Sequence, residues 1–60
     1  MDSKTLINSL EKNGWTLVRV KGSHHTFKHP DFPDLVTVKH PDKEVAKGTL
    51  SQIKRKSGMK

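Results

Sequence analysis

Lys21-Gly22-Ser23-His24-His25-Thr26-Phe27-Lys28-His29 is the stretch that decides the fold, because it predicts a tight turn leading into a strand. Successive side chains of a strand point to opposite faces of its sheet. The stretch therefore divides into two sets, one of His24, Thr26 and Lys28 and the other of His25, Phe27 and His29. Phe27 is the apolar member and predicts that its set faces the core. His24 is then left on the open face beside a lysine, and His25 and His29 are expected to be packing or rim residues.

The residues before this strand predict a helix and a first strand. Apolar residues recur at helical spacing over about residues 3–12, and Asn13-Gly14 supplies a stop that tolerates the left-handed conformation. Residues 15–20 have the β-branched and aromatic composition of a strand, although both of its faces carry apolar residues. Gly22, in so short a connection, predicts a hairpin turn that needs a positive φ.

The residues after it predict a third strand and a second helix. His29-Pro30 should end the histidine strand, since proline cannot donate to a ladder. Residues 35–40 alternate as a strand does. Thr49 and Gln52 have the spacing of a capping box at the start of a helix, and Gly58 stands where that helix would stop.

The order helix, strand, strand, strand, helix predicts an α+β fold in a single domain over residues 1–60. Connections this short cannot make parallel crossovers, so we expect a three-stranded antiparallel sheet with both helices on one face. The open face would carry His24, Thr26, Lys28, Thr37 and Lys39. The covered face would hold Phe27, Val36, Val38 and part of residues 15–20, packed by Leu6, Ile7, Leu10, Leu50 and Ile53.

The formal net charge of +6 is large for 60 residues and indicates a polyanionic partner, of which nucleic acid is the usual one. An anionic membrane would require a strongly apolar helix face, which the sequence lacks. The chain has no cysteine, no apolar run that could cross a membrane and no apolar signal-peptide core, so we expect a soluble cytoplasmic protein. Charge that only keeps the protein soluble is the alternative.

Four histidines raise the question of a metal site, but their spacing argues against one. His24 and His25 point to opposite faces. His25 and His29 are roughly 13 Å apart at a strand rise of about 3.3 Å per residue, whereas zinc ligands lie about 2 Å from the metal. Only a pairing with His40 remains, and we expect neither a metal nor a cofactor. Ser23 next to His24 does not make a hydrolase pair, since neighbours along a strand diverge.

General acid–base cleavage of RNA needs fewer groups. An imidazole that titrates near neutral pH, a cation that stabilises the phosphorane and the 2′-hydroxyl of the substrate are sufficient. His24 with Lys28 or Lys39 could supply the protein's part. An exposed histidine is more often a surface or phosphate-binding residue, and that interpretation stays open at this point.

Motifs spread over nearly the whole chain occur at Gly14-Trp15, Lys21-Gly22-Ser23-His24-His25, Phe27-Lys28-His29-Pro30, Val36-Thr37-Val38, His40-Pro41 and Lys47-Gly48-Thr49-Leu50 with Ile53. Together they resemble the HicA family of bacterial toxins. The Gly-Ser-His-His motif in a helix–strand–strand–strand–helix order is fairly specific for this family.

The resemblance implies a double-stranded-RNA-binding-domain-like fold and an mRNA interferase, a metal-independent endoribonuclease that cleaves mRNA, inhibits translation and arrests growth. The catalytic histidine of the family falls on His24 and its turn glycine on Gly22. We therefore expect RNA contacts from Gly22, Ser23, Lys28 and Lys39. The resemblance also implies a HicB-type antitoxin that covers the active face and joins in repressing the operon.

Two other functions are compatible with the same residues. A non-catalytic RNA-binding module could use the same basic surface, and the salt dependence of RNA binding would not distinguish it from an enzyme. A protein whose main task is to bind an acidic partner could also use the open basic face.

Overall fold

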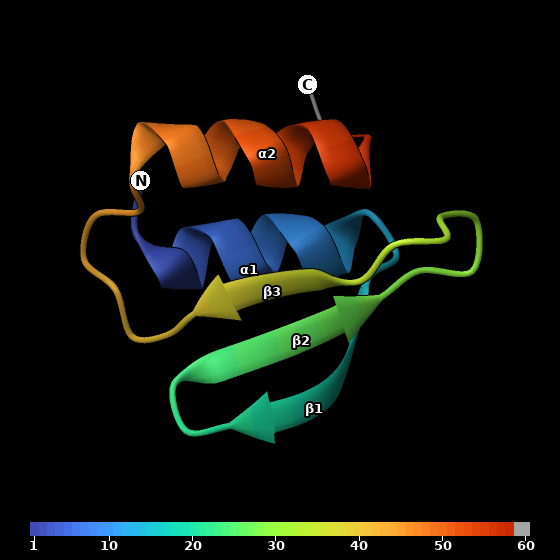
Figure 1. Cartoon of the computed structure of the whole chain (residues 1–60), viewed down its shortest axis with the longest axis horizontal. Helices are drawn as coiled ribbons and strands as arrows, with labels where there is room; N and C mark the ends of the chain where they lie inside the picture. Colours follow the sequence, from blue (N-terminus) through green and yellow to red (C-terminus); the bar gives the residue numbers. More distant parts are fainter. Residues whose placement is uncertain (59–60) are drawn as a thin grey trace.

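The chain forms two helices and three strands in the order that the sequence predicts (Figure 1). The structure is a computed structural model that describes residues 1–58. Its elements are α1 (Ser3–Lys12), β1 (Thr16–Lys21), β2 (His24–Lys28), β3 (Val36–Lys39) and α2 (Lys47–Ser57). The three strands form one antiparallel sheet in the order β1-β2-β3, which confirms the predicted α+β class.

The first helix begins and ends where its sequence predicts. Asp2 is the N-cap, and its carboxylate accepts a hydrogen bond from the Thr5 backbone N–H at 3.0 Å. Hydrogen bonds from the Thr5 side chain and backbone lower the pKa of Asp2. This contribution to stability is present above the ordinary pKa of an aspartate and is lost as the pH falls through the lowered value. Gly14 has a φ of 92° and turns the chain toward β1.

The pairing of β2 and β3 confirms the predicted division of side chains between the two faces. Phe27 lies opposite Val36 and His25 lies opposite Val38, which places these four residues on one face. The residues between them in sequence therefore share the other face. Phe27 is 1% exposed and shows that its face is the covered one.

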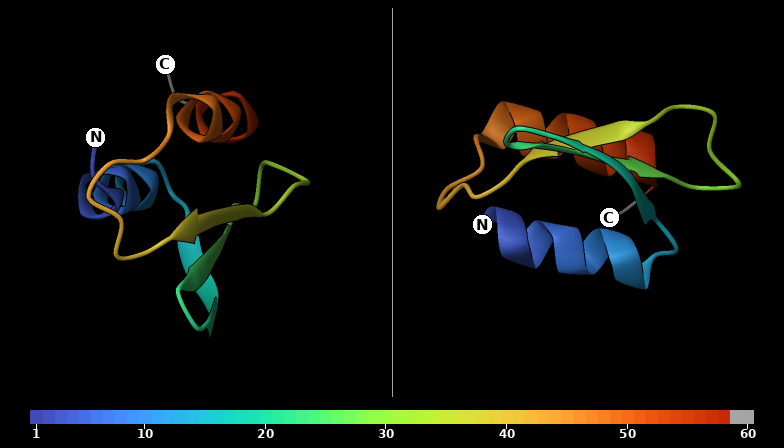
Figure 2. Two further views of the ribbon diagram at one scale, coloured as in Figure 1. Left: turned by 60° about the vertical axis from the view of Figure 1, so that its left-hand side comes forward. Right: turned by 90° about the horizontal axis from the view of Figure 1, so that it is seen from below.

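The core lies between that face of the sheet and the two helices. Its buried apolar residues are Leu6, Leu10, Trp15, Phe27, Val36, Val38, Val45 and Ile53, with Ile7, Phe32 and Leu50 partly buried against them. The sequence predicted most of this set but not Val45 or Phe32. Both helices make their sheet contacts mainly with β3. In the left view of Figure 2 the hairpin of β1 and β2 extends away from both helices. Both helices thus lie on the covered face.

Part of residues 15–20 was expected in the core, and Trp15 is the residue of this run that is buried there. Every residue of β1 is exposed, because both helices make their main sheet contacts with β3, at the other edge of the sheet. A β-bulge between Leu17 and Arg19 also changes which residues share a face. The ambiguous pattern of this run reflects a strand that neither helix covers.

The capping box at Thr49 was also a wrong prediction. The second helix begins at Lys47, with Ala46 as an N-cap that makes no side-chain hydrogen bond. Leu50 N–H already donates to the Ala46 carbonyl at 2.9 Å, so Thr49 lies inside the first turn. Gly58 has a φ of 71° and ends the helix as predicted.

His29 has a structural role, in agreement with its predicted position at the rim. Its Nε2 atom lies 2.9 Å from the Asn13 carbonyl, to which it donates, and its Nδ1 atom accepts from the Asp31 N–H at 3.0 Å. The ring also packs against Trp15 and Phe32, with centroid distances of 5.2 and 4.9 Å. With both nitrogens engaged, this imidazole ties the end of β2 to the turn after α1.

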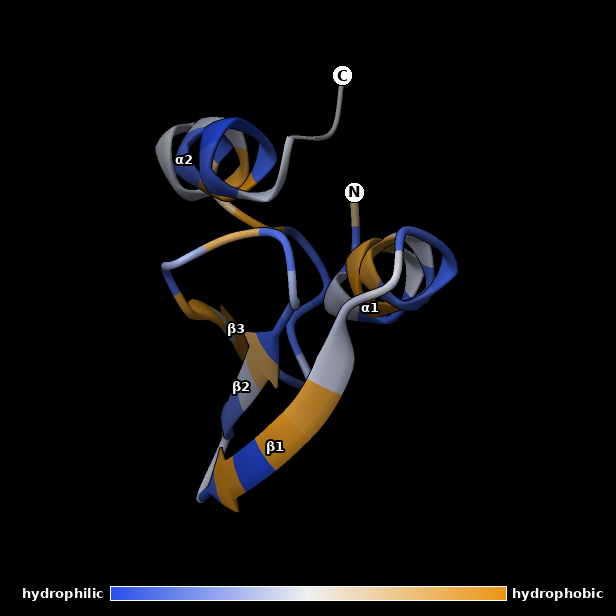
Figure 3. Ribbon diagram, turned by 90° about the vertical axis from the view of Figure 1, so that its right-hand side faces the viewer, coloured by the Kyte–Doolittle hydropathy of each residue, from blue (hydrophilic) through white to orange (hydrophobic). Residues whose placement is uncertain are grey.

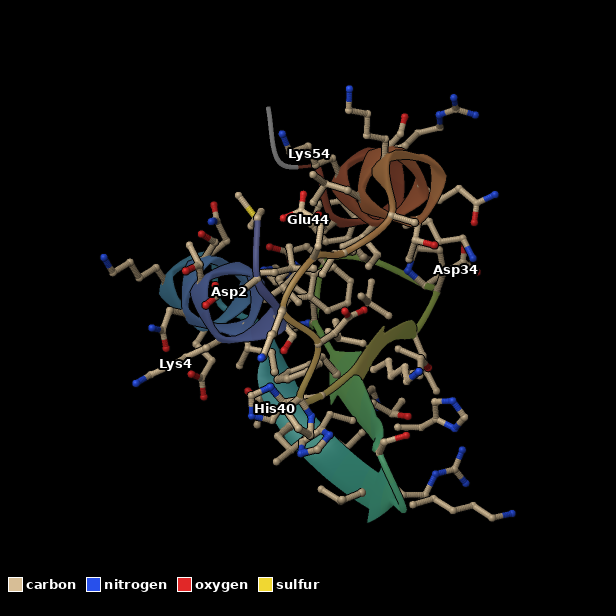
Figure 4. The ribbon with its side chains drawn as sticks, turned by 90° about the vertical axis from the view of Figure 1, so that its left-hand side faces the viewer. Asp2, Lys4, Asp34, His40, Glu44 and Lys54 are labelled. Carbon is tan, nitrogen blue, oxygen red and sulfur yellow. The ribbon has the colours of Figure 1, made fainter. Side chains whose placement is uncertain are left out.

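Ser3 joins the start of α1 to the turn after β3. Its Oγ accepts a hydrogen bond from the Asp42 N–H at 2.8 Å and lies 2.7 Å from His40 Nδ1. Because the Asp42 N–H can only donate, the Ser3 hydroxyl can use its proton toward a neutral His40. Figure 4 shows His40 below the N-terminal end of α1 and beside the strands. Ser3 is 1% exposed, so water does not replace these bonds.

We predict that Ser3→Ala lowers the free energy of unfolding by about 1–3 kcal/mol, because it removes the partner of two half-buried groups, the Asp42 N–H and His40 Nδ1. Urea denaturation followed by circular dichroism measures this. Ser9→Ala, on the same helix, is the control and should change stability by less than about 0.5 kcal/mol. Equal effects of the two substitutions would contradict the role of Ser3.

Candidate functional site

His24 lies on the open face between two lysines. It is the first residue of β2, and it is exposed. In the register of the sheet it lies opposite Lys39 of β3 and opposite Lys21 of β1. Directly opposed residues on antiparallel strands have their Cβ atoms about 4.5–5.5 Å apart. The structure thus surrounds this imidazole with cations from both neighbouring strands.

The remaining predicted residues of the open face extend away from His24 along the strands. Thr26 lies opposite Thr37, with 3.4 Å between their hydroxyl oxygens, and Arg19 lies on its other side. Thr26 is only 6% exposed and therefore contributes to the floor of this face. Lys28 is four residues from His24, roughly 13 Å at the rise of a strand. Of the two predicted lysines, only Lys39 is a direct neighbour of His24.

Two histidines on the covered face, His25 and His40, contact the Gly22-Ser23 turn that precedes His24. Gly22 has a φ of 58°, whereas Ser23 does not have a positive φ, a pattern shared with type II′ hairpin turns. The Ser23 carbonyl accepts the His40 N–H at 2.7 Å and lies 3.3 Å from His25 Nδ1, which must be the donor. His25 and His40 also pack edge to face, with 5.1 Å between their ring centroids. These two histidines support the turn and do not share the face of His24.

Sequence reasoning missed Lys21 and Arg19 as members of the site. It treated Lys21 as part of the connection, whereas Lys21 is the last residue of β1 and pairs with His24. A hairpin loop of two residues places the residue before the loop opposite the residue after it. A two-residue loop at Gly22-Ser23 would therefore have predicted that Lys21 lies opposite His24. The β-bulge after Leu17 shifts the register of β1, so the alternation of the sequence did not predict that Arg19 lies on the open face.

The cations of the open face have no acidic partner among the described residues. Within residues 1–58, none of Arg19, Lys21, Lys28 and Lys39 forms an ion pair. Over the same described range, no group of three or more histidine or acidic side chains is arranged to hold a metal ion. Lys21 and Lys39 beside one exposed imidazole, with Arg19 and Lys28 farther along the same face, form a basic surface that attracts a polyanion.

The part of the chain that the structure describes contains no helix long and apolar enough to cross a membrane.

Comparisons with known proteins identify the class of molecule that has this fold and this arrangement. A family model described as "HicA toxin of bacterial toxin-antitoxin" matches residues 3–59. The chain is also similar to a solved structure titled "HicA3 and HicB3 toxin-antitoxin complex", with a TM-score of 0.87 and 34% sequence identity over 100% of this chain and 97% of the matched one. A search of curated protein sequences gave no match.

This class is the small toxin of a bacterial toxin–antitoxin system. More particularly, the chain belongs to the HicA toxin family.

We predict that Gly22→Ala destabilises the protein by about 1–2 kcal/mol, the cost of the left-handed conformation for a residue with a side chain. The strain comes from φ alone, because a Cβ at Gly22 would meet no atom of the described residues within 4 Å. Gly48→Ala is a matched control, since its Cβ also meets open space but its φ is not positive.

Thermal unfolding of the two variants tests this difference. Gly48→Ala should be neutral or stabilising by up to about 1 kcal/mol, because alanine is the better helix former. If both substitutions changed stability in the same direction and by the same amount, the turn would not require glycine.

Proposed function

We propose that this toxin is a metal-independent endoribonuclease, an mRNA interferase, in which His24 transfers a proton during cleavage of the phosphodiester bond. The observation that supports it is the position of His24, exposed on the open face and directly opposed by Lys39 and Lys21. An imidazole between two ammonium groups combines proton transfer with stabilisation of a phosphorane.

The reaction uses the 2′-hydroxyl of the RNA as nucleophile. This oxygen attacks the adjacent phosphorus while the bond from phosphorus to the 5′ oxygen breaks, leaving a 2′,3′-cyclic phosphate and a 5′-hydroxyl. His24 takes the proton of the 2′-hydroxyl or, in its protonated form, gives one to the leaving oxygen. The opposite proton transfer falls to a second group, for which Lys39 and Lys21 are the nearest cationic candidates. The lysines balance the negative charge that develops on the phosphorane oxygens.

RNA binds, in this proposal, across the turn and along the open face. Gly22 has no side chain and leaves open space beside the turn, so the backbone of Gly22 and Ser23 can approach the RNA closely. Lys39 contacts the phosphate at which cleavage occurs. Lys28, farther along β2, contacts a phosphate of a neighbouring nucleotide. This binding is mainly electrostatic and releases counterions.

The cellular consequence of this activity is loss of mRNA, inhibition of translation and arrest of growth until an antitoxin neutralises the toxin. We propose a HicB-type protein as that antitoxin. The proposal is supported by the similarity over the whole chain to the toxin of a complex that contains HicA3 and HicB3.

We predict that His24→Ala lowers the rate of RNA cleavage by about 10²–10⁴-fold, the usual contribution of general acid–base catalysis. The matched control is His25→Asn, whose side-chain amide can still donate to the Ser23 carbonyl. Cleavage of a labelled RNA by both purified variants measures the effect. The control should keep the parental rate within a few fold, and a His24→Ala protein that cuts RNA at the parental rate would contradict the proposal.

We predict that Lys39→Ala weakens RNA binding and lowers the slope of log affinity against log salt by roughly 0.7, the value for one phosphate contact on a single strand. Lys12→Ala removes the same charge from α1, away from the open face, and is the control. Binding to a fluorescent RNA at several salt concentrations gives both slopes. Equal losses of slope for the two variants would show that only the net charge matters.

A further inference from the structure

The strand β1 exposes an apolar surface that the protein itself does not cover. Leu17 is 42% exposed, and Val18 and Val20 are each 52% exposed. They lie within four consecutive positions of one edge strand. Figure 3 shows the apolar residues of this strand on a ribbon that extends away from both helices.

This surface is continuous with the core. Leu17 lies opposite Phe27 and Val20 lies opposite His25, so both point toward the face that the helices cover. The helices end over the β3 side, which leaves these two side chains half uncovered. An edge strand with exposed aliphatic side chains and unpaired backbone groups is a template for another chain, and proteins usually protect such an edge.

We propose that this surface, Leu17, Val18 and Val20 of β1, is where the HicB-type antitoxin docks. The inference rests on the proposed function for the identity of the partner. The antitoxin contributes apolar side chains against Leu17 and Val20, and its backbone pairs with the free edge of β1 by strand addition.

The charges around the surface select an acidic partner over a second copy of the toxin. Arg19 and Lys21 lie on the same strand as the apolar residues. Pairing of β1 with its own copy would bring these cations toward their equivalents in chains that each carry a formal net charge of +6. Like charges opposed across strands are destabilising. RNA does not fit this surface either, because Leu and Val offer no aromatic face on which bases stack.

The position of the surface also explains how docking would regulate the enzyme. Lys21 continues β1 beyond Val20 and lies opposite His24. A partner strand along β1 therefore ends beside the catalytic imidazole, where it covers the cations that would bind RNA.

The test measures binding of a purified HicB-type antitoxin. The variant Leu17→Thr/Val20→Thr removes apolar surface but keeps residues suited to a strand. We expect it to bind the antitoxin at least about tenfold more weakly, as for loss of central interface residues. It should still cleave RNA at the parental rate, which also shows that it is folded. Growth arrest by this variant should no longer be relieved by the antitoxin.

The matched control is Leu35→Thr, at an exposed leucine outside β1 that is 48% exposed. It should bind the antitoxin as the parental chain does. If the double variant is less stable than the parental chain, Val20→Thr alone, at a position that is 52% exposed, provides the same comparison.

The outcomes separate this inference from the function on which it rests. Parental affinity of the double variant would overturn the docking surface while leaving the antitoxin as the partner. Failure of the parental chain to bind the antitoxin would overturn both. Sedimentation velocity of the toxin alone should show a monomer, and a dimer that the double variant abolishes would assign the surface to a second copy instead.

Discussion

Burial of Phe27 is the constraint on which the rest of the structure depends. A strand alternates its faces with a period of two, so the choice of one buried residue fixes the direction of every other side chain on β2. With Phe27 packed against Leu6 and Leu10 in one core, His25 turns to the same side and supports the hairpin turn, while His24 turns to the opposite one. A slip of one residue would bury a lysine and expose the phenylalanine. Packing of Phe27 on the covered face thus determines that His24 lies on the open face.

Much of the fold could be predicted from local patterns, and the failures have physical reasons. The spacing of Leu6 and Leu10, the left-handed glycines at positions 14, 22 and 58, and the alternation around Phe27 depend only on neighbouring residues. The exposure of β1 does not, because it follows from where the helices lie over the sheet. The start of α2 was missed for a similar reason, since backbone bonding from Ala46 competes with the cap offered by Thr49. Val45 enters the core from a connection without periodicity.

The sequence predicted the central residues of the candidate site but missed two of the surrounding cations. Strand parity singled out His24 and Lys39, and their direct opposition needed only the register that the β2–β3 pairing supplies. Lys21 required the loop length of the hairpin, and Arg19 required the bulge that precedes it. No sequence pattern indicated that Ser3 and His40, 37 positions apart, would bond and brace the turn through the Ser23 carbonyl. Such contacts between distant segments depend on the assembled fold.

The most direct measurement of the central claim is cleavage of RNA by the purified toxin in an excess of metal chelator, with analysis of the product ends. A matched RNA carries a 2′-deoxy nucleotide at the cleaved position. Proton transfer by His24 with the 2′-hydroxyl as nucleophile predicts cleavage in chelator, 2′,3′-cyclic phosphate and 5′-hydroxyl ends, and an intact deoxy-substituted RNA. Intact RNA in chelator at high toxin concentration, or cleavage of the deoxy-substituted strand at that position, would contradict it.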